Sequence, residues 1–409
     1  MKKLLLISIL LPTIVFGQKW EKTYMNGIGY SVQETADGGY IVAGEDGSSN
    51  LILFKTDKWG DALWSKTYGD SYNWSTSVIE TPNGEFVLTG KKGDAVFLMK
   101  TDHTGDTIWT RSFKFQNNDG GFTVDQTDDG GFMIVGTSTD TLAKDNVLLI
   151  KTNESGDALW TKLIGGEQNM SGWDGQQTSD GGYMVVGRYR TNLSVSGVLL
   201  MKTDNMGNVL WIQTYDESIG EFGYSGEQTS DGGYIITGTS INQDILLLKT
   251  DTNGDILWTK TYGGNVGNVG YAVTQTSDGG YVITGEKNWS MDESDLFLLR
   301  TDDSGELLWI RQYGGEGVDY GYSVQQTSDG GFIVAGCRFE TAVGPTIYLI
   351  KTDNEGEVLF SIDIPYPNPE RRLVKTIDFS GREITKPGRN IPCIKIFDDG
   401  TIQKIMNIE

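Results

Sequence analysis

The chain has 409 residues, a formal charge of −22, 55 glycines, 11 tryptophans, 2 cysteines and one histidine. With His103 as its only imidazole, we expect no His-based zinc site, Ser-His-Asp triad or Cys-His dyad, since each relies on an imidazole as ligand or base. Two cysteines cannot form a disulfide framework, and the negative charge repels phosphate, so we expect no nucleic-acid or anionic-membrane partner.

The first segment, residues 1–17, has the pattern of a cleaved signal peptide. Lys2 and Lys3 precede an apolar run from Leu4 to Phe16, and Val15-Phe16-Gly17 before Gln18 has the small-residue pattern of a cleavage site. The run is short for a bilayer span, and no later segment approaches the ~20 apolar residues of a membrane helix. We therefore predict a secreted protein without a membrane span after cleavage.

Residues 18–363 repeat a short unit seven times. Thr-x-Asp-Gly-Gly-aromatic recurs every 46 to 51 residues from Asp37 to Asp329, with Thr81–Phe86 as a weaker copy. A second signature, Leu-x-Lys-Thr-Asp-x-x-Gly-Asp-x-Leu-Trp, follows each time, as in Leu246–Trp258. This period is close to that of a four-stranded propeller blade.

Each repeat divides into four short strands, as in residues 321–326, 331–336, 346–351 and 257–262. They are rich in Val, Ile, Tyr and Thr, and Gly, Asp and Asn bound them. Asp-Gly-Gly supplies the positive φ angles of a tight hairpin. The fold prediction is an all-β, seven-bladed β-propeller of four-stranded blades.

The fourth strand has eight candidate copies, although the other three have seven. Residues 20–24 are a full copy, whereas residues 358–362 carry Phe360 where the others carry tryptophan. We predict that residues 20–24 pair with Thr346–Lys351 as the outer strand of the last blade, which closes the ring and hides sheet edges.

Seven tryptophans occur at the same position of successive repeats. They are Trp20, Trp64, Trp109, Trp160, Trp211, Trp258 and Trp309. Their Asp-x-x-Gly-x-x-x-Trp spacing resembles the tryptophan-docking repeat of quinoprotein dehydrogenase propellers, which implies indoles wedged between adjacent blades. The vicinal disulfide and cofactor cluster of those enzymes have no counterpart here, so the resemblance implies a scaffold only.

The remaining repeated residues are charged. A lysine or arginine ends each third strand, from Lys55 to Lys351, where it neutralises local carboxylates or, alternatively, forms a ring of cations for an anion. The acidic turns, such as Asp57–Asp61, are read as solvated Asx-type turns, with calcium binding as the alternative. No other cofactor or metal is expected.

Residues 364–409 differ in composition from the repeats. They hold five of the eight prolines and more basic than acidic residues. Tyr366–Pro369, Ile377–Glu383 and the Lys404 strand resemble, in order, the C-terminal sorting domain of the type IX secretion system of Bacteroidota. The resemblance implies a small β-sandwich-like domain that engages the secretion machinery, and a protein that is extracellular or on the outer cell surface.

A ligand site is expected on the propeller face whose loops vary from blade to blade, around the central channel. Aromatic residues beside Asn, Asp and Arg suit a carbohydrate or peptide. The candidates are Tyr72, Trp74, Trp173, Asp174, Arg188, Asp216, Trp289, Asp319 and Tyr320.

Two functions remain open at this point. The first is a non-catalytic, monomeric module that binds an unknown glycan or protein. The second is a glycoside hydrolase or lyase with paired carboxylates, the general acid and base that this composition allows. Near-equivalent blades without a distinctive acidic motif favour the binding module, and no catalytic residue is assigned.

Overall fold

The structure is a computed structural model that divides the chain into two compact units, Met1–Val358 and Leu359–Glu409. In the first unit it describes residues 19–69, 73–166, 169–191, 196–215, 222–264, 267–287, 294–315, 317–340 and 344–358. In the second it describes residues 373–377, 393–397 and 402–405. The predicted signal peptide, residues 1–17, lies outside the described residues.

All regular elements within these residues are β-strands. The first unit contains β1 (Trp20–Glu34), β2 (Tyr40–Asp46), β3 (Leu51–Thr56), β4 (Ala62–Tyr68), β5 (Asn73–Glu80), β6 (Phe86–Lys92), β7 (Ala95–Thr101), β8 (Thr107–Phe113), β9 (Asn118–Gln126), β10 (Phe132–Thr139), β11 (Asp145–Thr152), β12 (Ala158–Ile164), β13 (Asn169–Gln177), β14 (Tyr183–Arg190), β15 (Ser196–Thr203), β16 (Val209–Tyr215), β17 (Phe222–Gln228), β18 (Tyr234–Thr239), β19 (Ile245–Thr250), β20 (Ile256–Tyr262), β21 (Val269–Gln275), β22 (Tyr281–Lys287), β23 (Asp295–Thr301), β24 (Leu307–Tyr313), β25 (Asp319–Gln326), β26 (Phe332–Glu340) and β27 (Gly344–Thr352).

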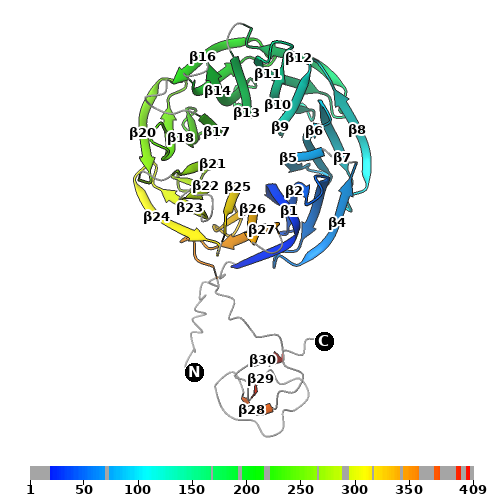
Figure 1. The fold of residues 1–409 in the computed structure, drawn as a ribbon, viewed down its shortest axis with the longest axis vertical. Helices are drawn as coiled ribbons and strands as arrows, with labels where there is room; N and C mark the ends of the chain where they lie inside the picture. The colour runs from blue at the N-terminus through cyan, green and yellow to red at the C-terminus, as the bar shows by residue number, and fades with distance from the viewer. Residues whose placement is uncertain are drawn as a thin grey trace, which may run out of the picture. The chain divides into compact units, whose positions relative to one another are not determined.

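The strands of the first unit form antiparallel sheets arranged as a ring around a central channel (Figure 1). Five sheets have four strands each, and a sixth has seven, in the order β25-β26-β27-β1-β2-β3-β4. Because β1 belongs to two blades, the described strands make seven four-stranded blades. The first strand of each blade faces the channel and the fourth lies on the perimeter, as the labels of β5 and β8 show (Figure 1).

Strand β1 closes the ring. Its first half pairs antiparallel with β27, with Trp20 opposite Lys351 and Thr23 opposite Tyr348. Its second half pairs with β2 as the inner strand of the first blade. The predicted pairing of residues 20–24 with the third strand of the last blade is therefore confirmed. The surplus fourth-strand copy in the sequence is the basis of that prediction. Of the competing copy, Val358 is described and lies outside any strand, and residues 359–362 are outside the described residues.

The hydrophobic core lies between adjacent blades. Strands such as β3 and β19 are buried at every residue, because neighbouring blades cover both faces of each sheet. Ile41 and Leu53 of one blade pack with Val78 and Phe86 of the next, and equivalent clusters occur around the ring. Burial on both faces explains why these strands are apolar runs without polar alternation.

The seven repeated tryptophans bridge neighbouring blades. The Trp20 ring contacts the turn glycine Gly60 of the next blade so closely that a Cβ there would lie 2.7 Å from it, and Gly60 has a φ of +76°. Trp20 also packs edge-on against Tyr40, with ring centroids 5.7 Å apart, and its Nε1–H donates to the Lys58 carbonyl at 3.1 Å. Equivalent tryptophan–glycine contacts pair Trp64 with Gly105, Trp109 with Gly156, Trp160 with Gly207, Trp211 with Gly254, Trp258 with Gly305 and Trp309 with Gly356.

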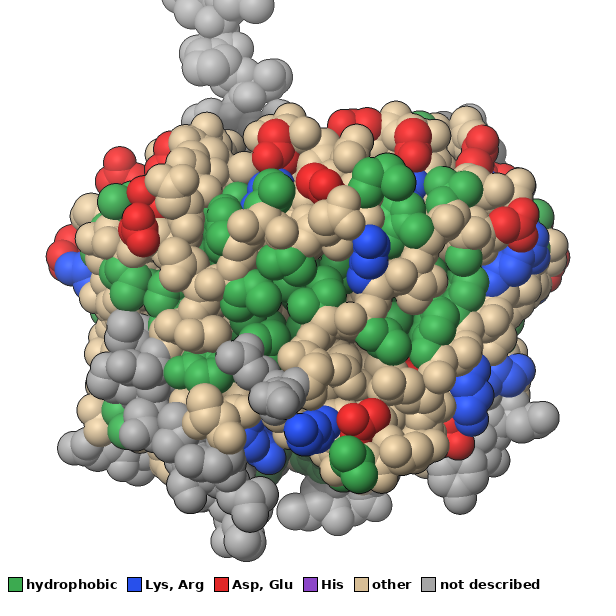
Figure 2. Space-filling view, turned by 90° about the horizontal axis from the view of Figure 1, so that it is seen from above, with side chains coloured by type: hydrophobic (Ala, Val, Ile, Leu, Met, Phe, Trp, Pro, Cys, Tyr) green, Lys and Arg blue, Asp and Glu red, His purple; other side chains and the backbone are tan. Residues whose placement is uncertain are grey.

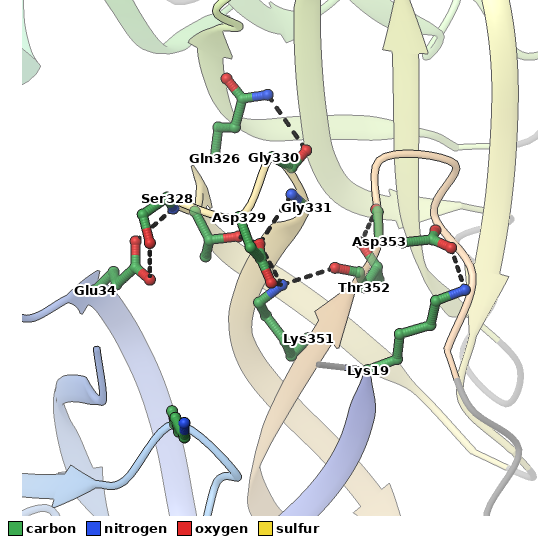
Figure 3. A network of polar contacts seen from close by, with 12 residues as sticks. Lys19, Glu34, Gln326, Ser328, Asp329, Gly330, Gly331, Lys351, Thr352 and Asp353 are labelled. Atoms are coloured by element: carbon green, nitrogen blue, oxygen red, sulfur yellow. Dashed lines mark hydrogen bonds and ion pairs between the residues drawn. The ribbon is translucent and has the colours of Figure 1, made fainter. Parts of the chain in front are cut away.

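The basic residue at the end of each third strand is buried under the turn between the first and second strands of its own blade, which is Asp-Gly-Gly in six blades and Asn-Gly-Glu in the second. Lys202 Nζ lies 2.9 Å from the Asp180 carboxylate and donates to the Thr203 carbonyl at 2.8 Å. Figure 3 shows the same arrangement for Lys351, Asp329 and Thr352. The other pairs are Lys55–Asp37, Lys100–Glu85, Lys151–Asp129, Lys249–Asp231 and Arg300–Asp278.

These ion pairs help to lower the pKa of the acidic partner, as Asp180 shows. Partial burial raises the pKa of Asp180, but hydrogen bonds from Thr178 and Lys202 outweigh it and lower the pKa to about 2. Each described cation of the set is thus paired with a carboxylate of its own blade, about 20 residues earlier in the chain. The pairs lock the hairpin between the first and second strands to the third.

Several apolar side chains on the outer wall of the ring are exposed to solvent. An exposed apolar residue precedes six of the seven docking tryptophans, and Figure 2 shows hydrophobic side chains on this wall among charged ones. The exposed residues are Leu63, Ile108, Leu159, Leu210, Leu257 and Leu308.

The second unit contains one described sheet. Its strands β28 (Leu373–Ile377), β29 (Cys393–Phe397) and β30 (Ile402–Ile405) pair antiparallel in the order β28-β29-β30. The rest of the predicted sandwich-like sorting domain, 364–409, lies outside the described residues. Across the described part of the chain, no helix is long and apolar enough to span a membrane.

Candidate functional site

Every inner strand has a β-bulge at the same position. In β1 the register with β2 shifts between Gly29 and Ser31, so Tyr30 is the extra residue. In β13 the shift lies between Gly172 and Asp174, so Trp173 is the extra residue. A bulge re-aims one side chain out of the normal alternation, and here each bulged residue lines the channel.

The bulged residues form an aromatic collar around the channel. We use this name for Tyr30, Phe122, Trp173, Tyr224, Tyr271 and Tyr322, with Thr76 at the seventh position. Ring centroids of neighbouring members are 5.0 Å apart for Trp173 and Tyr224 and 5.2 Å apart for Tyr224 and Tyr271. The separation is 5.3 Å for Tyr271–Tyr322 and for Tyr30–Tyr322. Five of the rings therefore form a continuous arc.

The collar encloses a cavity of about 390 Å³ that all seven inner strands line. A second cavity of about 250 Å³ adjoins it, since Tyr224 and Tyr271 line both. Phe222, Thr239 and Glu286 also line the second cavity. These volumes suit a small molecule or a few linked rings, and the combination of apolar faces with a few polar groups is typical of binding sites.

In six of the seven blades the side chain of the residue after the bulge forms a hydrogen bond to the next blade; the seventh such residue, Ala272, has no polar side chain. Ser31 Oγ accepts the backbone N–H of Val78 at 3.2 Å, and Ser77 Oγ accepts that of Val124 at 3.2 Å. Asp174 occupies this position in its blade and accepts the N–H of Gly226 at 2.9 Å. These bonds hold the collar residues in a rigid wall.

Two carboxylates of this wall resist ionisation. Burial raises the pKa of Asp174, against the hydrogen bonds that it accepts from the Gly226 and Gly175 N–H groups. Burial also raises the pKa of Glu227 to about 7, and the negative charge of Asp174 contributes in the same direction. Glu227 accepts the N–H of Gln275, so both carboxylates are engaged with the backbone of the next blade.

Glu227 takes a place that glutamines fill in two other blades and that Asp125, whose Oδ2 accepts the Gln177 N–H at 2.8 Å, fills in a third. Gln33 Oε1 accepts the N–H of Glu80 at 2.6 Å, and Gln325 Oε1 accepts that of Glu34 at 2.8 Å. The Glu227 carboxylate accepts a backbone N–H, as the side-chain amide oxygens of Gln33 and Gln325 do. Its raised pKa follows from burial without a neighbouring cation in the described part of the chain.

A half-buried arginine lies beside the collar. The Arg188 guanidinium lies over two rings, 5.5 Å from the Trp173 centroid and 5.2 Å from that of Phe222. Trp173 and Phe222 are themselves stacked, with centroids 5.9 Å apart and planes 19° apart. Burial lowers the pKa of Arg188, and the charge of Arg190 lowers it further. Strand β14 ends at Arg190, on the face where the loops vary.

The structure places some of the predicted ligand residues together and not others. Trp173 and Asp174 line the same cavity, and Arg188 lies over the Trp173 ring. Tyr320 stacks on the collar residue Tyr322, with centroids 5.7 Å apart. Asp319 is fully buried, and its Oδ2 accepts the Gly315 N–H at 3.0 Å, so it anchors the loop before β25.

Four candidates cannot be located at side-chain level. Tyr72, Asp216 and Trp289 lie outside the described residues. The backbone of Trp74 belongs to β5, and its side chain is outside the described part.

Sequence reasoning missed most of the collar. Tyr30, Phe122, Tyr224, Tyr271 and Tyr322 were not among the candidates. The available signal is a glycine followed by an aromatic residue near the start of each first strand, which six of the seven repeats carry. A collar glycine leaves room for the neighbouring blade: a Cβ on Gly223 would lie 2.8 Å from Val198.

The acidic turns between the third and fourth strands use their carboxylates internally. Asp57 Oδ1 accepts the N–H groups of Trp59 and Asp61, both at 2.8 Å. Asp204 and Asp251 repeat this pattern. Among the described residues, no group of three or more His, Cys, Asp or Glu side chains is placed to hold a metal ion.

No family model matches the chain, and no characterised protein matches its sequence. Many solved structures resemble it in shape. One is the WD40 domain of Pan2 from Neurospora crassa, with a TM-score of 0.50, 8% identity, and coverage of 85% of this chain and 94% of that one. The fold is a WD40-like β-propeller. At such low identity the likeness shows the fold alone, so function has to be argued from the site.

Proposed function

We propose that the protein is a non-catalytic binding module that holds a glycan or a protein ligand at the aromatic collar of its channel. The observation that carries this proposal is the collar itself. Seven bulges at equivalent positions turn six aromatic side chains toward one cavity of about 390 Å³. Large apolar rings lining an open channel are unusual for a purely structural surface.

The collar chemistry suits ring-shaped ligands. Aromatic faces stack on the C–H faces of sugars or on peptide side chains. Hydroxyl groups of Tyr271 and Tyr30 bond to Glu286 and Glu45 at 2.8 and 3.1 Å, which adds polar groups around the rings. The rigid inter-blade bonds behind the collar reduce the entropy lost on binding.

We further propose that the module is secreted as a monomer, through the signal peptide 1–17 and the type IX-like sorting segment 364–409. The proposed location is the extracellular medium or the outer cell surface. The proposed partners are the secretion machinery and the ligand, without nucleic acid. No cofactor is required in this proposal, and calcium at the acidic turns is the one metal worth testing, by thermal unfolding with and without a chelator.

A glycan array and a panel of surface proteins test the binding proposal. Wild-type protein should retain one class of ligand, and Trp173→Ala should lose it. Trp59→Ala is the matched control, because Trp59 is 54% exposed on an outer turn away from the channel. Equal binding by Trp173→Ala and wild type would refute a site at the collar.

The alternative is a carbohydrate-active hydrolase or lyase. One observation favours it: Asp174 lines the channel and its raised pKa suits a general acid. Release of new reducing ends or unsaturated sugars by wild type, abolished in Asp174→Asn, would establish catalysis. Binding without product release would leave the module as proposed.

A further inference from the structure

Three described arginines lie over tryptophan rings, and they differ in their partners. Arg111 lies 5.1 Å from the Trp109 centroid and its Nε is 3.0 Å from Asp157. Arg311 lies over Trp309 in the same way and is 3.1 Å from Glu357. Arg188, over Trp173 and Phe222, has no ion pair or hydrogen bond to any residue in the described ranges.

The difference is meaningful because Arg188 is the half-buried member beside the collar. A guanidinium has five N–H donors, and a desolvated one without acceptors is unfavourable. The charge of Asp145 acts on Arg188, but no ion pair or hydrogen bond joins the two among the described residues; the Asp145 carboxylate accepts bonds from Thr139 and Ser171 at 2.8 and 3.0 Å. Burial and the charge of Arg190 lower the pKa of Arg188 more than the charges of Asp145 and Tyr224 raise it, which agrees with a cation that lacks a direct carboxylate partner among the described residues.

An incoming carboxylate would complete this arrangement. A guanidinium binds a carboxylate through two parallel N–H···O bonds, and its face can stay on the aromatic rings meanwhile. The stacked rings of Trp173 and Tyr224, 5.0 Å apart, continue from this point into the channel. A ligand that fits both parts carries an acid group next to a ring that can stack.

We propose that the collar binds a uronic-acid-containing glycan, with Arg188 bound to a uronate carboxylate and a sugar ring stacked on the collar. This deepens the proposed function and rests on it. A glycan is favoured over a peptide because the cavity offers a run of aromatic faces, whereas a peptide C-terminus would use the arginine alone.

The test is a calorimetric titration of the whole mature protein with three probes. They are hexagalacturonic acid, the neutral hexamer of galactose, and a hexapeptide with a free C-terminal carboxylate. Arg188→Met keeps the length and apolar contact of the side chain and removes its charge. Arg111→Met is the matched control, since it removes an equally stacked arginine that already has a carboxylate partner. Thermal unfolding verifies that each variant is folded.

Wild type and Arg111→Met should bind the acidic hexamer with equal affinity, and Arg188→Met should bind it at least about tenfold more weakly. Arg188→Lys should retain part of the affinity, and added salt should weaken binding by wild type. Equal affinity of wild type and Arg188→Met for the acidic hexamer would overturn the proposal. Preference of wild type for the neutral hexamer or the peptide, or no binding of the acidic hexamer, would also overturn it.

Failure of the wider proposal gives a different result. If Trp173→Ala binds whichever ligand wild type binds with unchanged affinity, the collar is not the site. If Trp173→Ala loses binding and Arg188→Met does not, the collar is the site and the uronate assignment is wrong.

Discussion

Removing the Trp20 indole should weaken the closure of the ring. Trp20 is 9% exposed, contacts Gly60 and Tyr40 of the first blade, and donates to the Lys58 carbonyl at 3.1 Å. Its backbone belongs to the last blade, opposite Lys351. The side chain thus joins two blades that are far apart in sequence. Replacing a buried tryptophan by alanine costs about 3 to 5 kcal/mol, so Trp20→Ala should lose an amount in that range.

Urea unfolding followed by tryptophan fluorescence and by circular dichroism measures this loss. Trp211→Ala is the control, because its indole makes the same contacts with Gly254 and Tyr234 between consecutive blades. The Trp211 indole is half-buried, so we expect a smaller loss of about 2 to 4 kcal/mol. A loss below ~1 kcal/mol for Trp20→Ala would show that the indole does not hold the ring closed.

Three further substitutions test the inter-blade and turn contacts. Glu227→Gln should raise the unfolding temperature at pH 8 and change it little at pH 4. Burial raises the pKa of Glu227 in the folded protein to about 7, so the stability that its protonated form contributes is fully present below the pKa of the unfolded chain and is lost as pH rises toward 7. An equal effect of the substitution at both pH values would contradict this. Asp180→Ala should cost about 2 to 4 kcal/mol, because Lys202 is only 4% exposed and would lose its counterion; an unchanged midpoint in urea would refute the role of the pair. Gly254→Ala should destabilise by at least ~1 kcal/mol, since its φ is +81° and a Cβ would lie 3.0 Å from the Trp211 ring; calorimetry showing no change would mean that the turn relaxes freely.

The ring could be predicted because each repeat carries its own local signals. Asp-Gly-Gly and Asp-x-x-Gly mark two hairpins per blade, and their glycines do adopt positive φ, as at Gly181 and Gly207. The surplus fourth-strand copy predicted that residues 20–24 close the last blade. These inferences depend on short-range turn chemistry and on counting, which a single sequence provides.

The collar could not be found by the same route. Regular alternation along an inner strand assigns Tyr30 or Trp173 to one face of the sheet, between blades. The bulge, which depends on pairing with the second strand, turns the residue toward the channel instead. The partner of Lys202 was hidden for a similar reason, because Asp180 is brought to it by the pairing of β14 with β15.

The most direct measurement of the central claim is the shift of indole N–H signals in a nitrogen-15 spectrum as hexagalacturonic acid is added. The Trp173 signal should move with saturation, because its ring belongs to the collar and lies beside Arg188. The signals of docking indoles such as Trp211, which face the outer turns, should stay in place. Saturable binding that leaves the Trp173 signal unmoved would contradict a ligand site at the collar.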